Sequence, residues 1–93
     1  MRLKEFEQAA ILSTVKCFDP GACVYLFGSR VDDTKKGGDI DLLILSHRLG
    51  RDDARAIKSR LYDLIGEQKI DLVVASDDSN PFVGLAIETG VKL

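Results

Sequence analysis

Residues 25–45 read YLFGSRVDDTKKGGDIDLLIL, and both the fold and the function of the chain are best interpreted outward from this stretch. It starts with an apolar segment, passes through a Gly-Ser turn and a polar segment, and ends in a second apolar segment headed by Asp-Ile-Asp. Successive side chains of a strand point to opposite faces of the sheet. Asp39 and Asp41 are therefore predicted to share one face, opposite the apolar face that begins with Ile40.

The paired carboxylates and the preceding turn together indicate a site for phosphate chemistry. Two neighbouring carboxylates raise the pKa of one of them unless a cation lies between them, and Mg²⁺ is a hard cation that prefers oxygen ligands. Gly28 allows close approach of the backbone, and Ser29 offers a hydroxyl and an N–H group to a phosphate. Each motif is unspecific alone, but a metal at Asp39 and Asp41 that faces a phosphate cradle is what phosphoryl transfer requires.

At these residues the chain resembles the DNA polymerase β-like nucleotidyltransferase superfamily, and within it the minimal nucleotidyltransferases of bacteria and archaea. The matching pattern is Gly28-Ser29, a spacer over residues 30–38, and then Asp-Ile-Asp-Leu at 39–42; an arginine after the serine, here Arg30, is also usual. Many relatives have a serine where Gly38 stands and Arg-Gly where residues 32–33 stand. These departures affect the expected loop geometry and not the metal pair.

The resemblance also implies a third carboxylate and assigns roles to the site residues. In the superfamily this carboxylate lies on the strand after the crossover helix, and Asp71, at the head of IDLVVA (70–75), is the matching position. The resemblance implies two Mg²⁺ ions, ATP as substrate and a polymerase β-like fold. Its implied catalytic and metal-binding residues are Asp39, Asp41 and Asp71, and its implied nucleotide-binding residues are Gly28, Ser29 and Arg30.

The pattern of apolar residues predicts an α/β (α+β) fold with a small mixed sheet of three or four strands flanked by helices. A single domain is expected over residues 1–93. Leu42, Ile44 and Val73 are expected to be buried strand residues. Helices are predicted over 3–18, 51–65 and 82–89, and strands over 22–27, 39–45, 70–75 and 91–93, with the first strand buried on both faces.

Composition excludes several other classes of protein. A net charge of −2 argues against a nucleic-acid surface dominated by phosphate contacts. No apolar run approaches a membrane span and the start lacks a signal-peptide core, so a cytoplasmic protein is expected. The two cysteines, Cys17 and Cys23, are expected to be reduced. Neither a P-loop nor a Rossmann glycine motif is present.

The acceptor of the nucleotidyl group is where alternatives stay open. Superfamily members that act on tRNA, DNA or antibiotics carry a further domain, so the acceptor is expected to be held by another protein or by a second copy in a homodimer. The resemblance implies a helical partner of the HEPN class and an antitoxin that transfers AMP to a tyrosine of that RNase toxin. The alternatives are a non-catalytic nucleotide-binding module that neutralises its partner by binding, and a small-molecule adenylyltransferase.

Each site residue also has an ordinary explanation. Asp39 and Asp41 could be a solvated pair at a strand end, and Asp71 could be a single acid heading a strand. Gly28 and Ser29 could form a tight turn. Arg30 could be a surface charge as readily as a contact to the triphosphate.

Overall fold

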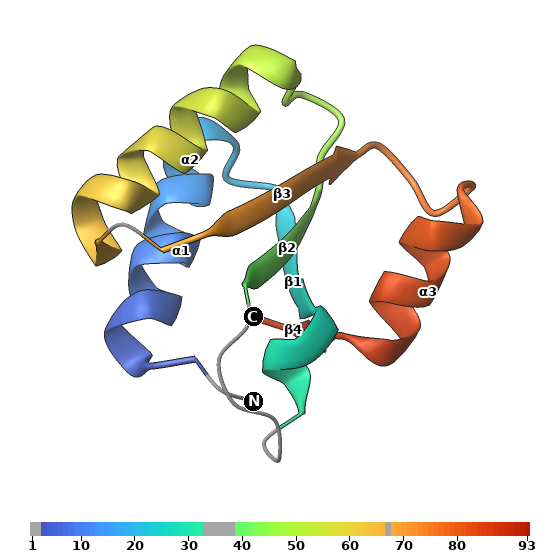
Figure 1. Cartoon of the computed structure of the whole chain (residues 1–93). Coiled ribbons are helices and arrows are strands. Elements are labelled where there is room, and N and C mark those ends of the chain that lie inside the picture. Colours follow the sequence, from blue (N-terminus) through green and yellow to red (C-terminus); the bar gives the residue numbers. More distant parts are fainter. Residues whose placement is uncertain (1–2, 33–38, 67) are drawn as a thin grey trace.

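A computed structural model describes residues 3–32, 39–66 and 68–93, with Ser29 described through its backbone. It confirms the mixed sheet flanked by helices, an α+β arrangement (Figure 1). The elements in chain order are α1 (Glu5–Phe18), β1 (Cys23–Phe27), a 3₁₀ turn η1 (Gly28–Val31), β2 (Ile40–Leu45), α2 (Arg51–Ile65), β3 (Ile70–Ala75), α3 (Pro81–Thr89) and β4 (Val91–Lys92). The first helix begins two residues later than predicted and the other helices agree closely with the sequence prediction.

The sheet has the strand order β3-β2-β1-β4. β1 pairs antiparallel with β2 and with β4, whereas β2 and β3 are parallel because helix α2 crosses over between them. Asp41 lies opposite Phe27 of β1 and opposite Asp71 of β3. This register sets the residue pairs at the end of the sheet where β2 and β3 begin.

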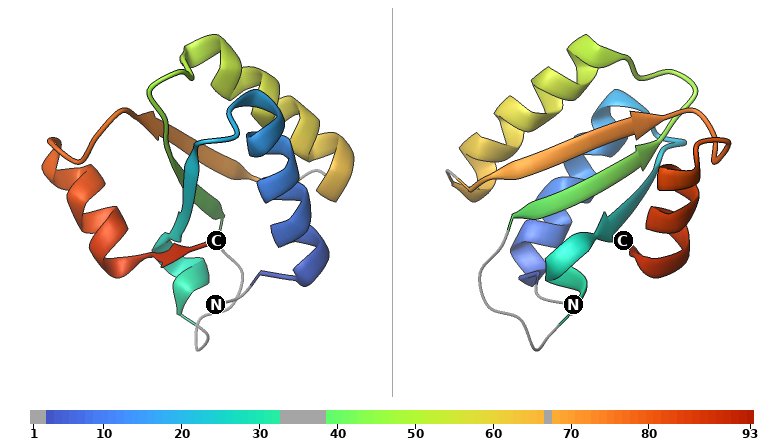
Figure 2. Two further views of the ribbon diagram at one scale, coloured as in Figure 1. Left: turned by 180° about the vertical axis from the view of Figure 1, so that it is seen from behind. Right: turned by 45° about the vertical axis from the view of Figure 1, so that its right-hand side comes forward.

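Helices cover both faces of the sheet (Figure 2). Helices α1 and α2 lie on one face, over a core that includes Ile11, Leu42 and Ile57, and α3 lies on the other face with Leu43 and Val83. Leu42 and Ile44 are completely buried, as predicted. Burial of side chains like these is the main contribution that stabilises a small domain.

Two predictions about burial were wrong. Val73 is only half-buried, because β3 is an edge strand and a single short helix covers that face of it. β1 is not buried on both faces: Val24 and Leu26 are buried under α1 and α2, whereas Cys23, Tyr25 and Phe27 alternate with them and remain half-buried. The apolar sequence of β1 therefore predicted more burial on the α3 face than this helix provides.

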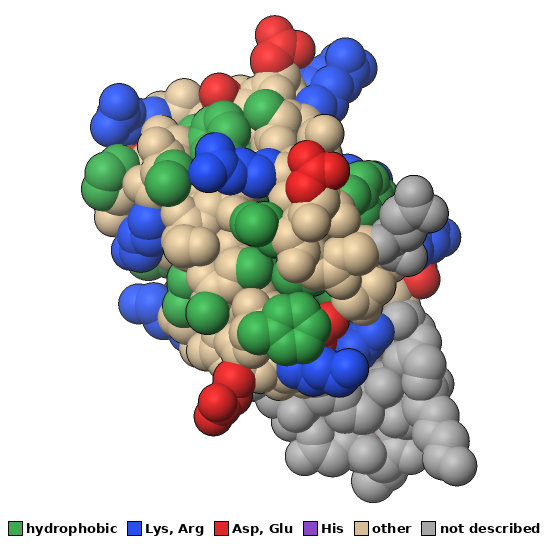
Figure 3. Space-filling model, turned by 90° about the vertical axis from the view of Figure 1, so that its left-hand side faces the viewer, with side chains coloured by type: hydrophobic (Ala, Val, Ile, Leu, Met, Phe, Trp, Pro, Cys, Tyr) green, Lys and Arg blue, Asp and Glu red, His purple; other side chains and the backbone are tan. Residues whose placement is uncertain are grey.

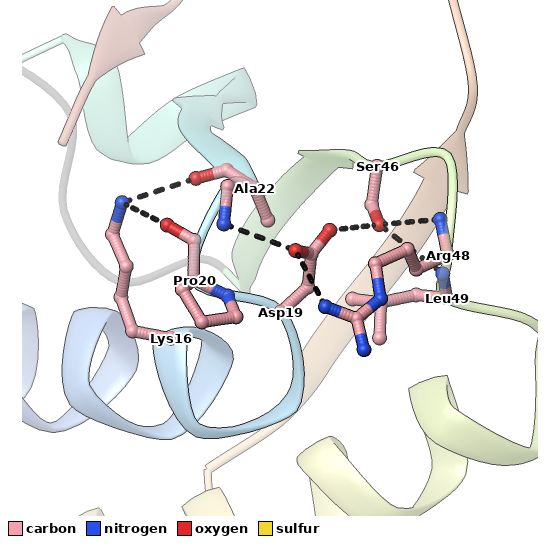
Figure 4. A network of polar contacts seen from close by, with 8 residues as sticks. Lys16, Asp19, Pro20, Ala22, Ser46, Arg48 and Leu49 are labelled. Carbon is pink, nitrogen blue, oxygen red and sulfur yellow. Dashed lines mark hydrogen bonds and ion pairs between the residues drawn. The ribbon is translucent and has the colours of Figure 1, made fainter.

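A buried polar network ties the turn after α1 to the end of β2 (Figure 4). The Ser46 hydroxyl donates to Asp19 at 2.5 Å and accepts hydrogen bonds from the backbone N–H groups of Arg48 and Leu49, both at 3.1 Å. Gly21 N–H donates to the same carboxylate at 3.0 Å. The network fixes the sheet end opposite to Asp41.

The surface formed by α1 and α2 carries hydrophobic side chains among charged ones (Figure 3). Phe6 and Leu64 are each at least half exposed there. Among the described residues no helix is both long and apolar enough to cross a membrane.

Candidate active site

Gly28 brings the end of β1 against β2, the strand that carries Asp41. Its φ of +77° is in the left-handed region that favours glycine. A Cβ at this position would collide with the Asp41 carboxylate and would lie 3.2 Å from its Cγ. The glycine is therefore needed twice, for the turn into η1 and for the space that the Asp41 side chain occupies.

Asp41 and Asp71 meet because β2 and β3 are parallel and in register. The two residues are direct cross-strand neighbours, and Asp71 is near enough to raise the pKa of the Asp41 carboxyl. Asp41 is half-buried whereas Asp71 is exposed. The structure therefore places Asp71 next to Asp41 of the Asp-Ile-Asp motif.

The environment of Asp41 disfavours its ionised form. Burial raises the pKa of the Asp41 carboxyl, and the charge and hydrogen bond of Asp71 raise the pKa further, followed by the charge of Asp39. Lys69 acts in the opposite direction, more weakly. A half-buried carboxyl with a raised pKa, next to a second carboxyl, offers oxygen ligands whose mutual repulsion a divalent cation would reduce, so the chemistry of Asp41 and Asp71 fits Mg²⁺.

Asp39 is paired with Lys69, for which the sequence predicted no role in the site. Lys69 Nζ lies 3.3 Å from Asp39 Oδ2, and this partner, together with the nearby Asp71 and Asp41, raises the pKa of Lys69. Among the described residues, no three acidic, histidine or cysteine side chains form a ready metal-binding group. Asp39 would have to exchange Lys69 for a metal ion in order to act as its ligand.

Arg30 is held beside this end of the sheet by a relay of polar side chains. Its Nη2 donates to Gln68 Oε1 at 3.4 Å, and Gln68 Nε2 donates to Glu7 Oε2 at 2.6 Å. Glu7 is buried and also accepts the backbone N–H of Lys4 at 3.0 Å. The relay fixes the guanidinium close to the β3 entry, where it could meet an anion.

Of the residues that the sequence predicted, the structure brings together Asp41, Asp71 and Gly28. Asp39 precedes β2 directly and shares its charge environment with these acids. The Ser29 side chain lies outside the described part of the chain, as do residues 33–38, so the predicted serine contact to phosphate stays a prediction.

Comparison with protein families agrees with this geometry. A family model described as polymerase beta, nucleotidyltransferase matches residues 10–93. The chain belongs to this nucleotidyltransferase family. Comparison with curated proteins gives no match. Membership supports a nucleotidyltransferase activity in general and agrees with the α+β fold.

Lys69 and Gln68 are the site residues of this nucleotidyltransferase domain that sequence reasoning missed. A signal for Lys69 was present: DIDLL at 39–43 and KIDLV at 69–73 align without a gap. Once β2 and β3 are parallel with Asp41 opposite Asp71, the same register sets Lys69 beside Asp39. The contact of Gln68 with Glu7 joins residues 61 positions apart, and no local pattern indicates it.

Proposed function

We propose that this domain transfers AMP from Mg²⁺-bound ATP to a hydroxyl group of a partner protein. The observation that carries the proposal is the convergence of Asp41 and Asp71 beside Gly28, with Asp39 directly preceding the same strand. Membership in the family supports nucleotidyl transfer. Such a transfer would use the acid cluster, by which we mean Asp39, Asp41 and Asp71.

The residues can be assigned roles in this reaction. The acceptor oxygen would bond to the α-phosphorus of ATP while the bond to the pyrophosphate group breaks, and the acceptor proton would pass to a base. Asp39, Asp41 and Asp71 would hold Mg²⁺, which neutralises phosphate charge and makes the hydroxyl more acidic. The exposed Asp71 is the carboxylate that an approaching acceptor could reach, and it could assist the loss of the proton.

Binding of the triphosphate would depend on the turn at the end of β1. η1 begins at Gly28, directly beside Asp41, and in this proposal backbone N–H groups of the turn would donate to phosphate oxygens. Arg30, fixed by Gln68, would add a positive charge. Lys69 would leave Asp39 as the metal binds and could then contact a phosphate.

A protein acceptor is supported by the exposure of the acid cluster. Asp71 is exposed, and the Asp39 side chain is 39% exposed, so a side chain on the surface of a folded partner can approach them. The resemblance to minimal nucleotidyltransferases suggests a HEPN-type toxin as the partner and a tyrosine as the acceptor, which would make this domain an antitoxin.

Labelling of the partner tests this function. The protein is incubated with Mg²⁺, ATP labelled in its α-phosphate and the product of the adjacent gene, and the label is expected on a tyrosine of that product. Asp39→Asn and Asp71→Asn should abolish labelling while the domain stays folded. Asp63→Asn is the matched control, because Asp63 is an exposed aspartate on α2, outside the acid cluster.

Two outcomes would contradict the proposal and favour an alternative. If the wild-type protein neutralises the partner without labelling it, the domain is a binding module. If the partner is unlabelled and a small hydroxyl compound is adenylylated instead, the domain acts on small molecules.

A further inference from the structure

The outer edge of β3 has the features of a surface that pairs with another strand. β3 is the last strand of the sheet, and no strand of the described chain pairs with its outer side (Figures 1 and 2). Its sequence, IDLVVA, contains no proline or lysine, and its only charge is Asp71. Natural edge strands usually carry such residues, or bulges, to prevent pairing.

The backbone groups that face this edge can be identified. Lys69 C=O accepts from Ile40 N–H at 3.0 Å, and Ala75 C=O accepts from Ser46 N–H at 2.9 Å, so these odd-numbered residues face β2. Because the direction alternates along a strand, the N–H and C=O groups of Ile70, Leu72 and Val74 face outward. A strand that binds here must supply matching donors and acceptors.

A hollow beside the edge supplies a second, independent feature. It has a volume of about 410 Å³ and is lined by side chains of β3 and of the start of α2, among them Leu72, Val74 and Ala54. Leu72 and Val74 are half-buried members of the core on this face of the sheet. Apolar side chains from a neighbouring strand would continue this core and fill the hollow.

We propose that β3 pairs antiparallel with β3 of a second copy of this chain, with Val73 on the twofold axis. An antiparallel pair requires outward-facing residues to lie opposite each other. In this register Leu72 is opposite the partner's Val74 and exchanges both backbone hydrogen bonds with it. A twofold axis perpendicular to the sheet repeats this exchange. It places α1 and α2 of both copies on one face of the joined sheet and α3 of both copies on the other face.

Charge complementarity selects this register over its neighbours. With Val73 on the axis, Lys69 is opposite the partner's Asp77, and each of these contacts occurs twice in the dimer. Lys69 is 71% exposed at its side chain, and Asp77 is exposed on the loop after β3, so both can reach across the interface. Asp71 faces the partner's Ala75, a small side chain that leaves the carboxylate accessible.

The two adjacent registers lack this match. With Val74 on the axis, Asp71 would be opposite the partner's Asp77, and like charges directly opposite each other destabilise a strand pair. With Leu72 on the axis, Lys69 would face the partner's Ala75 and gain no charged partner. The register centred on Val73 also places the partner's Asp77 next to the Asp39–Lys69 ion pair, so the interface borders the candidate active site.

Charge reversal tests the pairing through the dimer dissociation constant, measured by sedimentation at low ionic strength, where surface charges are least screened. The wild-type chain is expected to be dimeric. Lys69→Asp or Asp77→Lys should each raise the dissociation constant by about tenfold, because two attractive cross-strand pairs become repulsive. The double variant Lys69→Asp/Asp77→Lys should recover most of the affinity. Lys92→Asp is the matched control, because Lys92 is exposed on β4 at the opposite edge of the sheet.

Cross-linking tests the register in a way that does not depend on charge. Val73→Cys in a Cys17→Ser background should form a disulfide-linked dimer, because residues opposite each other at such a position have Cα atoms about 4.5 Å apart, within disulfide range. Lys92→Cys in the same background should not cross-link. A monomeric wild type at high concentration would overturn the proposal, as would a dimer that Lys69→Asp leaves unchanged and Val73→Cys fails to cross-link.

Discussion

At the scale of single residues, Gly28 connects backbone conformation with the chemistry of the site. Its positive φ and the lack of a Cβ let the Asp41 carboxylate lie directly against the chain. Any other L-residue would have to move either the turn or the carboxylate. One position thus controls both the entry into η1 and the placement of a candidate metal ligand.

Gly28→Ala is expected to lower the free energy of unfolding by at least about 1–2 kcal/mol, the cost of a left-handed conformation for an L-residue, before the collision with Asp41 is counted. Urea denaturation measures this change. Gly21→Ala is the matched control: its Cβ would lie 3.6 Å from Asp19 Oδ1, an ordinary contact, and should cost little. Equal stability of the two variants would show that Gly28 does not have the conformation described.

The Asp19 carboxylate gives a prediction about pH. The hydrogen bonds from Ser46 and from the Gly21 N–H hold the pKa of Asp19 below its ordinary value; burial acts against them, and the Arg48 charge makes a smaller contribution that lowers the pKa. A carboxylate with a lowered pKa in the folded state stabilises the protein fully above its unfolded pKa, and this stabilisation is lost as the pH falls through the folded value.

Asp19→Asn should therefore remove part of the acid sensitivity of the domain. Unfolding free energies of wild type and variant are measured from neutral pH into the acid range, and their difference should shrink as the pH falls below the ordinary pKa of aspartate, 3.8. Asp41 has a raised pKa, so its contribution to the pH dependence of the unfolding free energy has the opposite sign. This contribution is the same in both proteins and cancels in the difference. A difference that stays constant with pH would contradict the role of this network.

At the scale of elements, β2 is the strand on which both the core and the site depend. It pairs with β1 and with β3. Leu42 and Ile44 are buried on the face covered by α1 and α2, and Asp41 shares the opposite face with Leu43, which is buried under α3. The same six residues therefore place Leu42 in the core and Asp41 beside Asp71.

Leu42→Ala should destabilise the domain by about 2–5 kcal/mol, the usual cost of removing a large buried side chain. The loss is expected because Leu42 is completely buried between the sheet and helices α1 and α2. Leu64→Ala on α2 is the control, since Leu64 is half exposed and its truncation leaves little cavity. Thermal unfolding that affects the two variants equally would place the core elsewhere.

A feature of the fold could be predicted from the sequence when the residues that determine it are close together in the chain. Alternation within β2 was enough to predict that Leu42 and Ile44 are buried. The helix predicted over 82–89 is α3, which begins one residue earlier, at Pro81, with Asn80 Oδ1 accepting Phe82 N–H at 2.8 Å. The incomplete burial of Val73 depends on its strand being at the edge of the sheet, and strand order is not a local property.

The same distinction applies to the site. Asp41 and Asp71 were found through a motif and a family pattern. Lys69 contacts Asp39 because β2 and β3 are parallel and in register, which the matching DIDLL and KIDLV segments alone do not establish. Gln68 contacts Arg30 of η1 and Glu7 of α1, and no local pattern indicates contacts between segments so far apart in the chain.

At the scale of the whole molecule, the two ends of the sheet are built differently. The end with Asp19 and Ser46 is closed by hydrogen bonds among protein groups, which is suited to holding elements together. The end with Asp41 and Asp71 gathers carboxylates, and an ion pair to Lys69 offsets only part of their charge. That excess of negative charge in a nucleotidyltransferase is the basis for the proposed metal and nucleotide site.

The most direct measurement of this claim is the affinity of the wild-type protein for ATP, determined by titration calorimetry with and without Mg²⁺. The Asp41 and Asp71 carboxylates would repel the triphosphate unless a metal ion lies between the carboxylates and the phosphates. Mg²⁺ should therefore strengthen ATP binding markedly. Asp41→Asn removes one ligand and one repelling charge and should reduce the dependence on Mg²⁺, whereas Asp63→Asn should leave the dependence unchanged. Equal affinity for ATP with and without Mg²⁺ in the wild-type protein would contradict a metal–nucleotide site at these carboxylates.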